Sequence, residues 1–278
     1  MPYQVTLMLI FAGFAIVEAW RHGLLNLNGE VKDDLKVELI GGPILLFATQ
    51  PLVLFTSAAL VGFILPDTKD ALITLPFWAA FGILILLDDL TQYWWHRLSH
   101  TLPWLYNLHR SHHNAEYMSV RMVYRNNVFY YLLMPGLWLS GAMLFMGLGE
   151  VYAVFIVVKL TIIIAAHSSV RWDQPLYKIK LLHPVMWVVE RLISTPTTHA
   201  AHHGKHTADG VTNYKGNFGN MLFLWDVIFG TAKITRHVPP AFGVEDLPPV
   251  TAAEQLVWPL VRSENTAITS APTVEQSA

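Results

Sequence analysis

The residues of this chain that are best suited to chemistry are its histidines, because eight of the 13 fall into three short clusters. The clusters are His96 with His100, then His109, His112 and His113, and finally His199, His202 and His203. Residues three and four positions apart lie on one face of a helix, so each cluster should present its rings in one direction. Imidazole is a common metal ligand, and we therefore predict that each cluster contributes to a metal site.

Eight imidazoles are more ligands than one metal ion can use, so the pattern predicts two ions. The second and third clusters share the spacing H-x-x-H-H, which suggests two equivalent half-sites that face one another. Imidazole suits iron, zinc and copper alike, so the spacing leaves the identity of the metal open. The isolated histidines His22, His206 and His237 are better explained by packing or by surface exposure.

The composition predicts a membrane protein. Hydrophobic residues make up 53% of the chain and charged residues only 14%, whereas roughly a quarter of an ordinary soluble domain is charged. The net charge of -2 excludes the broad basic surface of a nucleic-acid-binding protein. The absence of cysteine excludes disulfides, thiolate ligands and iron–sulfur clusters. We therefore predict an all-α, polytopic membrane bundle with a histidine-rich helical cap.

Five apolar stretches are candidates for membrane segments, since about 20 apolar residues of helix cross a bilayer. They are residues 5–20, 41–65, 71–87, 128–148 and 151–166. The last two meet at a short turn and form a helical hairpin over residues 128–166, which either crosses the membrane or re-enters it. We expect one catalytic domain over residues 1–240, with about three N-terminal spans, and a polar, partly disordered tail over 241–278.

The positions of the cationic residues predict the orientation of the chain. If the histidine clusters lie on the cytoplasmic side, all 18 Lys and Arg residues except Lys69 and Lys159 fall on that side too. Cytoplasmic loops of membrane proteins carry the excess of Lys and Arg. The pattern therefore predicts a multi-pass protein whose active site is on the cytoplasmic face.

Two segments resemble the fatty acid hydroxylase / sterol desaturase superfamily of membrane di-iron enzymes. They are DLTQYWWHRLSHTLPWLYNLHRSHHNAE, residues 89–116, and TPTTHAAHHGKHTADGVTNYKGNFGNMLFLWDVIFGT, residues 195–231. They match the family's ordered boxes H-x-x-x-H, H-x-x-H-H and H-x-x-H-H, and the predicted hairpin lies between them as it does in the family. The resemblance covers residues 71–231. Ser169 and the run Asn213-Tyr214-Lys215 depart from the family's pattern, which affects the assignment of the substrate more than that of the metal.

The resemblance implies two iron ions, O2 as co-substrate and electrons from an external reductase system. It carries over all eight clustered histidines as ligands and implies no catalytic residue distinct from the ligands. His167, which follows the hairpin, is similar to an additional histidine of the family and becomes a ninth ligand on that basis. As an alternative, a cationic His167 would stabilise the end of its helix through the helix dipole.

Two acidic residues are candidates to support the ligands. Asp89 precedes His96 by two helical turns, and Asp226 lies in a Trp-Asp pair within the second segment. A carboxylate in either place could accept the second ring N–H of a ligand histidine and orient the ring. Equally, each could be an interfacial acid that pairs with Arg97 or with another cation.

These features together predict a membrane-bound, O2-dependent oxidoreductase that hydroxylates or desaturates a lipid, either fatty acyl, sterol or a related isoprenoid. The partners would be the bilayer, the lipid substrate and a separate electron donor protein, with no nucleic acid. A membrane zinc hydrolase is one alternative, although such enzymes need few histidines and a carboxylate base. A metal transport or storage protein is another, although transport ligands usually lie at the membrane midplane.

Overall fold

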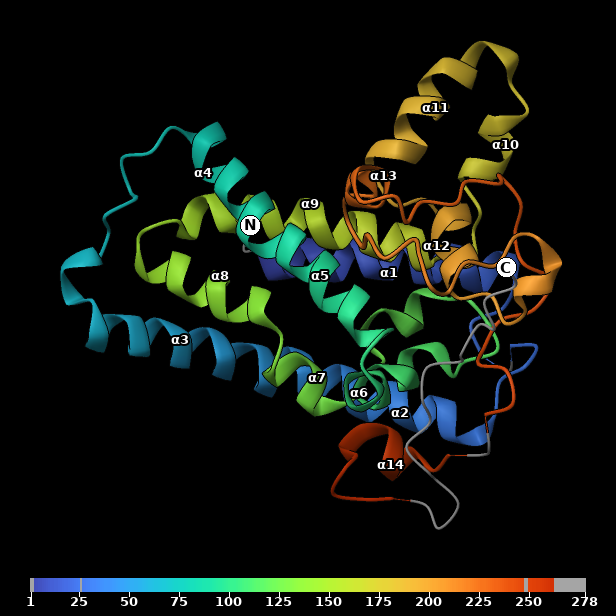
Figure 1. Ribbon diagram of the computed structural model, residues 1–278, viewed down its shortest axis with the longest axis horizontal. Coiled ribbons are helices and arrows are strands. Elements are labelled where there is room, and N and C mark those ends of the chain that lie inside the picture. The colour runs from blue at the N-terminus through green and yellow to red at the C-terminus, as the bar shows by residue number, and fades with distance from the viewer. Residues whose placement is uncertain (1–2, 26, 248–249, 263–278) are drawn as a thin grey trace, which may run out of the picture.

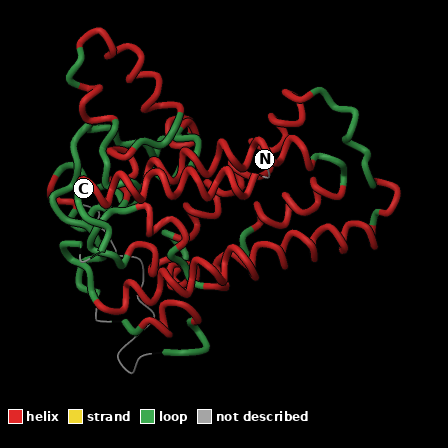
Figure 2. Tube along the Cα trace, turned by 180° about the vertical axis from the view of Figure 1, so that it is seen from behind, coloured by secondary structure: helices red, strands yellow, loops and turns green. Residues whose placement is uncertain are grey.

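The computed structural model describes residues 3–25, 27–247 and 250–262. Within these ranges the regular secondary structure is helical, apart from one isolated antiparallel bridge between Gly204 and Phe242. The prediction of an all-α protein is therefore confirmed. Long helices occupy one end of the molecule, and short helices and loops gather at the other (Figures 1 and 2).

Two long helices form the N-terminal part of the bundle. The first is α1 (Tyr3–Arg21). The second is continuous over residues 32–64 and consists of α2 (Lys32–Ile44), the π-helical turn η1 (Leu45–Thr49) and α3 (Gln50–Ile64). Proline has no N–H to donate within a helix, and η1 lies between Pro43 and Pro51. A π-helical turn changes the hydrogen-bond register locally, so the helix continues past both prolines.

A third long helix carries the chain toward the first histidine cluster. It consists of α4 (Phe77–Leu84), the π-helical turn η3 (Ile85–Asp89) and α5 (Leu90–Ser99). The predicted third span began at residue 71, but residues 66–76 form the 3-10 turn η2 (Pro66–Thr68) and further turns. The helix starts only after Pro76, because the fixed φ angle of proline suits the start of a helix better than its interior.

The predicted hairpin is a pair of unequal helices. After the short α7 (Val128–Leu132), its arms are α8 (Pro135–Phe145) and α9 (Gly149–His167). With 11 residues, α8 is about 16 Å long and cannot cross a bilayer core of about 30 Å. Three helices of the described chain are long and apolar enough to cross, namely Tyr3–Arg21, Lys32–Ile64 and Gly149–His167.

The remaining helices are short and surround the ends of α5 and α9 (Figure 1). They are α6 (Pro103–His113), η4 (Val120–Tyr124), α10 (Asp173–Tyr177), η5 (Lys180–Leu182), α11 (His183–Leu192), α12 (Pro196–His202), η6 (Thr207–Asp209), α13 (Leu224–Ile228) and α14 (Ala252–Val257). Although α14 lies in the predicted tail, it packs against α2 and α6 and buries Glu254, Gln255 and Leu256. Residues 263–278 of that tail lie outside the described residues.

The outer surface of the long helices is apolar. Phe47, Phe55 and Phe63 on the helix over residues 32–64 are 79%, 75% and 85% exposed. Exposure of so large an apolar surface to water is unfavourable, whereas contact with lipid chains carries no such cost. The exposed apolar faces of the long helices are therefore suited to lipid, and the short helices form a histidine-bearing cap at their ends.

Cysteine labelling can test which ends of the bundle lie on opposite sides of the membrane. Asp67 and Thr101 are exposed, and the chain contains no native cysteine. Asp67 precedes α4 and Thr101 follows α5, so we expect a membrane-impermeant maleimide to reach Asp67→Cys and Thr101→Cys from opposite sides. The exposed Asn28→Cys should be labelled from the same side as Thr101→Cys, and labelling of all three from one side would contradict this arrangement.

Candidate metal centre

The three histidine clusters and His167 meet where four helices of the bundle converge. The first cluster is at the end of α5, the second at the end of α6, and the third on α12, while His167 is the last residue of α9. All nine side chains are at most 5% exposed. The fold therefore gathers every histidine that the sequence analysis assigned to the metal, from segments up to about a hundred residues apart.

The nine rings form two sets, and within each set the potential ligand atoms lie within 4.8 Å of one another. The set of five contains His96, His100, His109, His113 and His202. The set of four contains His112, His167, His199 and His203. Neither set contains a carboxylate among the described residues.

Each H-x-x-H-H box is shared between the two sets, which the sequence analysis did not foresee. His109 and His113 join one set and His112 the other, whereas His199 and His203 join one set and His202 the other. Residues i and i+4 of a helix differ by about 40° around its axis, whereas residue i+3 differs from residue i+4 by about 100°. One box can therefore reach two ions, so the boxes are interleaved rather than separate half-sites.

The ring nitrogens approach one another closely inside both sets. The Nε2 atoms of His96 and His202 are 3.0 Å apart, and those of His167 and His199 are 2.9 Å apart. Burial and the neighbouring imidazoles lower the pKa of His113 and His203 well below the usual range. A neutral imidazole keeps one lone pair free for a metal ion, so the burial of the site prepares its ligands.

Most ligand rings are held at their Nδ1 atom by a hydrogen-bond acceptor. The backbone carbonyls of Phe218, Gly216, Arg125 and Ile163 lie 2.6, 2.7, 3.2 and 2.8 Å from Nδ1 of His96, His202, His112 and His167 respectively. A carbonyl can only accept, so these Nδ1 atoms carry the proton. The lone pair is then on Nε2, which points into the centre.

The remaining rings leave nitrogens without a hydrogen-bond partner. His100 Nε2, His199 Nδ1 and His203 Nδ1 are buried and have no partner within the described residues. An unpaired polar atom in a protein interior costs roughly 1–3 kcal/mol. A metal ion in the set of five would give His100 Nε2 a partner, and one in the set of four would coordinate the Nε2 atoms of His199 and His203, which face one another at 3.2 Å, so the residues present fit two cations.

The structure corrects the role predicted for Asp89. Its carboxylate does not contact a ligand ring but accepts hydrogen bonds from Trp225 Nε1 at 2.8 Å and from the backbone of Leu222 at 3.3 Å. Asp89 belongs to the π-helical turn η3, so its spacing to His96 is not that of a regular α-helix. The His96 ring instead faces the backbone carbonyl of Phe218. The alternative, an ion pair with Arg97, is not formed either, since Arg97 donates to Tyr93.

Asp226 supports the centre indirectly. Its carboxylate accepts hydrogen bonds from the backbone N–H groups of Phe218 and Gly219, at 2.8 and 2.6 Å, and from the Thr231 hydroxyl at 2.5 Å. The carbonyl of the same Phe218 orients His96. Asp226 therefore holds the Phe218 peptide, which in turn orients His96. The sequence analysis had proposed a direct hydrogen bond from a ligand ring to this carboxylate.

Asn126 is a supporting residue that the sequence analysis missed. Its Oδ1 lies 3.0 Å from His109 Nδ1, and its amide donates to the Tyr131 hydroxyl at 3.0 Å. No spacing rule connects Asn126 to His109, since the two residues lie on different segments.

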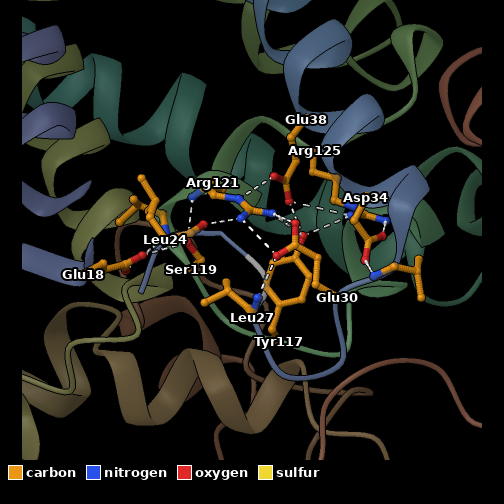
Figure 3. Close-up of polar contacts among 12 residues, drawn as sticks. Glu18, Leu24, Leu27, Glu30, Asp34, Glu38, Tyr117, Ser119, Arg121 and Arg125 are labelled. Atoms are coloured by element: carbon orange, nitrogen blue, oxygen red, sulfur yellow. Dashed lines mark hydrogen bonds and ion pairs between the residues drawn. The ribbon is translucent and has the colours of Figure 1, made fainter. Parts of the chain in front are cut away.

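A buried network of charges connects the N-terminal segment to the centre (Figure 3). Arg121 pairs with Glu30 at 2.8 Å and with Glu38 at 2.7 Å, while Arg125 pairs with Asp34 at 2.6 Å. The sequence does contain a signal for this network. The three acids are spaced by four residues, as are the two arginines, so each group occupies one face of a helix or turn.

The network supports the ligands through Arg125. Its side chain is fully buried and donates from Nε to the carbonyl of Ser111 at 2.7 Å, next to His112 in α6. Its own backbone carbonyl faces His112 Nδ1. The segment over residues 30–38 therefore contributes to the rigidity of the centre through these ion pairs.

Glu18 performs a similar function within α1. Although it belongs to an apolar helix, its carboxylate is 1% exposed and accepts hydrogen bonds from Ser119, Ser168 and the backbone of Ser169 at 2.7–2.8 Å. These residues follow α6 and His167. Glu18 thus ties the segments that leave both histidine-bearing helices, which is a sufficient physical reason for an acid in a membrane helix.

Comparison with known proteins places the chain in a family. The family model described as fatty acid hydroxylase matches residues 81–231, which is more than half of the 278 residues and includes all nine histidines. The chain belongs to the fatty acid hydroxylase family. The resemblance drawn from the histidine boxes is therefore confirmed.

Three curated relatives carry the same name. Alkylglycerol monooxygenase of Homo sapiens is 26% identical over 83% of this chain and 46% of its own length. The corresponding proteins of Danio rerio and Xenopus tropicalis are 30% and 27% identical, over 56% and 77% of this chain and 30% and 42% of their own. The chain spans less than half the length of these relatives. No solved structure matches it.

The hydrogen bond from His109 to Asn126 can be tested by mutation. We expect Asn126→Leu to lower metal affinity by about 10- to 100-fold, because loss of an outer partner leaves a ligand free to turn. Metal content after dialysis against graded chelator concentrations measures the change. The exposed Asn28→Leu is the matched control, and equal metal retention in both variants would remove Asn126 from a supporting role.

Proposed function

We propose that this protein is a multi-pass membrane monooxygenase that hydroxylates a lipid at a pair of iron ions held by the nine histidines. The observation that carries the proposal is the pair of buried, all-nitrogen ligand sets at the ends of α5, α6, α9 and α12. Membership of the fatty acid hydroxylase family supports iron, and the name of the relatives supports insertion of oxygen rather than desaturation.

The residues around the centre favour redox chemistry over hydrolysis. When bound, two iron ions would supply the activation of O2 and the oxidising power needed to break a C–H bond. A zinc hydrolase would need a carboxylate base beside an open site, but Asp89 and Asp226 both accept hydrogen bonds from fixed donors. Among the described residues neither acid faces the ligand sets.

The position of the centre argues against transport and storage. The ligands lie at the ends of the helices, not midway along the spans where transported ions bind. Every ligand is almost completely buried, so the site is built to retain its ions. We therefore place the centre in the histidine-bearing cap, as part of one catalytic domain over residues 1–240.

A cavity of about 100 Å³ adjoins the centre and gives a lipid access to it. His109, His112 and His167 line one end, and Ile156, Leu160 and Ile163 of α9 line its side. The apolar wall can hold an alkyl chain and exclude water from the reacting carbon. The protein's own contribution is to orient this chain beside the ligands.

The cap carries most of the cationic residues, so we propose that it faces the cytoplasm. The resemblance to the family implies an external reductase system, so we propose that electrons come from a separate donor protein that docks on the same side. The substrate is a lipid supplied from the bilayer.

Lipid turnover by purified protein tests the proposal directly. We expect two iron ions per chain and an O2-dependent conversion of an alkyl lipid to a hydroxylated product that contains oxygen from labelled O2. Zinc-substituted protein should be inactive, because zinc has no redox chemistry. Equal turnover by the zinc form, or turnover without O2, would overturn the monooxygenase proposal.

His167 tests the composition of the set of four. As a ligand, His167→Gln should lower iron content and nearly abolish turnover, because its Nε2 meets those of His112 and His199. As a partner of the helix dipole only, it would cost about 0.3–1 kcal/mol of stability and leave the iron in place. His206→Gln is a matched control, because His206 is exposed and pairs with Glu245. Full iron content in His167→Gln would reduce the ligands to eight.

A further inference from the structure

The cavity beside the centre contains polar side chains where a simple alkyl-chain tunnel would be apolar. Gln92 and Asp88 line it from the helix over residues 77–99, and Lys159 lines it from α9. Gln92 and Asp88 are four positions apart, so they lie on the same face of their helix. Together with Lys159, which pairs with Asp88, they form a polar strip in a cavity that apolar residues such as Leu137 also line.

The charged members of the strip neutralise one another. Lys159 Nζ forms an ion pair with Asp88 Oδ1, and Ser140 donates to Asp88 Oδ2 at 2.7 Å. Asp88 is 4% exposed and Lys159 5%. Each lies eight positions from a ligand on its own helix, His96 and His167 respectively, or about 12 Å along the axis. The pair is therefore inside the bundle, at substrate distance from the centre.

Stability alone does not account for this ion pair. Removing two charges from water costs several kcal/mol per ion, and well-packed apolar residues in place of a buried pair are often equally stable. Polar and ionisable residues within membrane helices usually mark a binding site or a pathway. The cavity that Asp88 and Lys159 line supplies the ligand that such a site requires.

Two amide side chains of the cavity are available to a ligand. Gln92 and Asn220 both line it, and neither side chain has a hydrogen bond to another described residue. Gln92 is one turn before His96, and Asn220 follows the Phe218-Gly219 peptide that supports it. An amide can both donate and accept, which suits an uncharged oxygen such as a hydroxyl or an ether.

We propose that Asp88 determines substrate specificity by neutralising Lys159, so that the cavity selects lipids with an uncharged oxygen-bearing group over anionic lipids. This inference rests on the proposed function of the centre. Because Asp88 already neutralises Lys159, a lipid carboxylate entering the cavity would bring an unpaired negative charge into an apolar site. An uncharged oxygen-bearing group could form hydrogen bonds with Gln92 and Asn220 without the cost of burying a charge.

The experiment compares a fatty alcohol with a fatty acid of the same chain length. Binding of each to the iron-loaded protein is measured at equilibrium without O2, so the result does not depend on turnover. We expect the wild-type protein to prefer the alcohol, and Asp88→Asn to shift the ratio of affinities toward the acid by about tenfold, because Lys159 is then an unpaired cation. The double variant Asp88→Asn/Lys159→Met should recover the preference for the alcohol.

The outcomes separate this role from a purely structural one. If the pair only fastens α9 to the neighbouring helix, the single variant weakens both lipids equally and the ratio stays constant, which overturns the inference. If Asp88→Asn does not fold, the wild-type comparison still decides, since equal affinity for acid and alcohol is contrary to the proposed selection. If the iron-loaded wild-type protein shows the binding preference but no O2-dependent turnover of either lipid, the monooxygenase proposal is refuted and the specificity role remains in place.

Discussion

The burial of nine imidazole rings around two candidate metal positions is the constraint on which the rest of the structure depends. Buried rings lose their protons, and neutral rings packed together leave nitrogens that face one another. Such an arrangement suits one metal ion in each of the two sets, provided that each ring is prevented from turning. The backbone carbonyls of Phe218, Gly216 and Arg125 prevent three of the rings from turning, so the backbone determines how those rings are oriented.

Much of the remaining chain serves to hold those carbonyls. Asp226 orients the Phe218 peptide through two backbone N–H groups. Arg125 is anchored by Asp34 and donates to the chain beside His112. Buried charges are costly in so apolar a protein, and their pairing in networks explains how they are tolerated. The N-terminal segment is therefore joined to the candidate metal centre by buried ion pairs.

The membrane helices also position a substrate relative to the centre. One helix, α9, carries His167 at its end and Lys159 two turns earlier, so the ligand and the polar strip of the cavity share a rigid element. The helix over residues 77–99 similarly carries Asp88, Gln92 and His96. A lipid bound along this wall would have its position relative to the metal determined by helix geometry, which does not vary with loop motion.

The sequence by itself determined the class of the protein, the nine histidines and their division among three boxes and one isolated position. Local periodicity was sufficient for the eight clustered histidines, because residues three and four apart on a helix must share a face wherever the helix packs. The class of the protein and the isolated His167 came from the resemblance to the family. The apolar stretches likewise indicated the long helices, although Pro76 delayed the third one and Pro135 shortened the first arm of the hairpin.

Only the tertiary structure decided how the ligands are shared and what supports them. The division of each H-x-x-H-H box between two sets depends on the angle at which α6 and α12 approach, which no local pattern specifies. The partner of His109 is Asn126, and that of Asp89 is Trp225, 136 residues away. Hydrogen bonds of this kind form between segments brought together by packing, so their partners are settled by three-dimensional proximity and not by spacing along the chain.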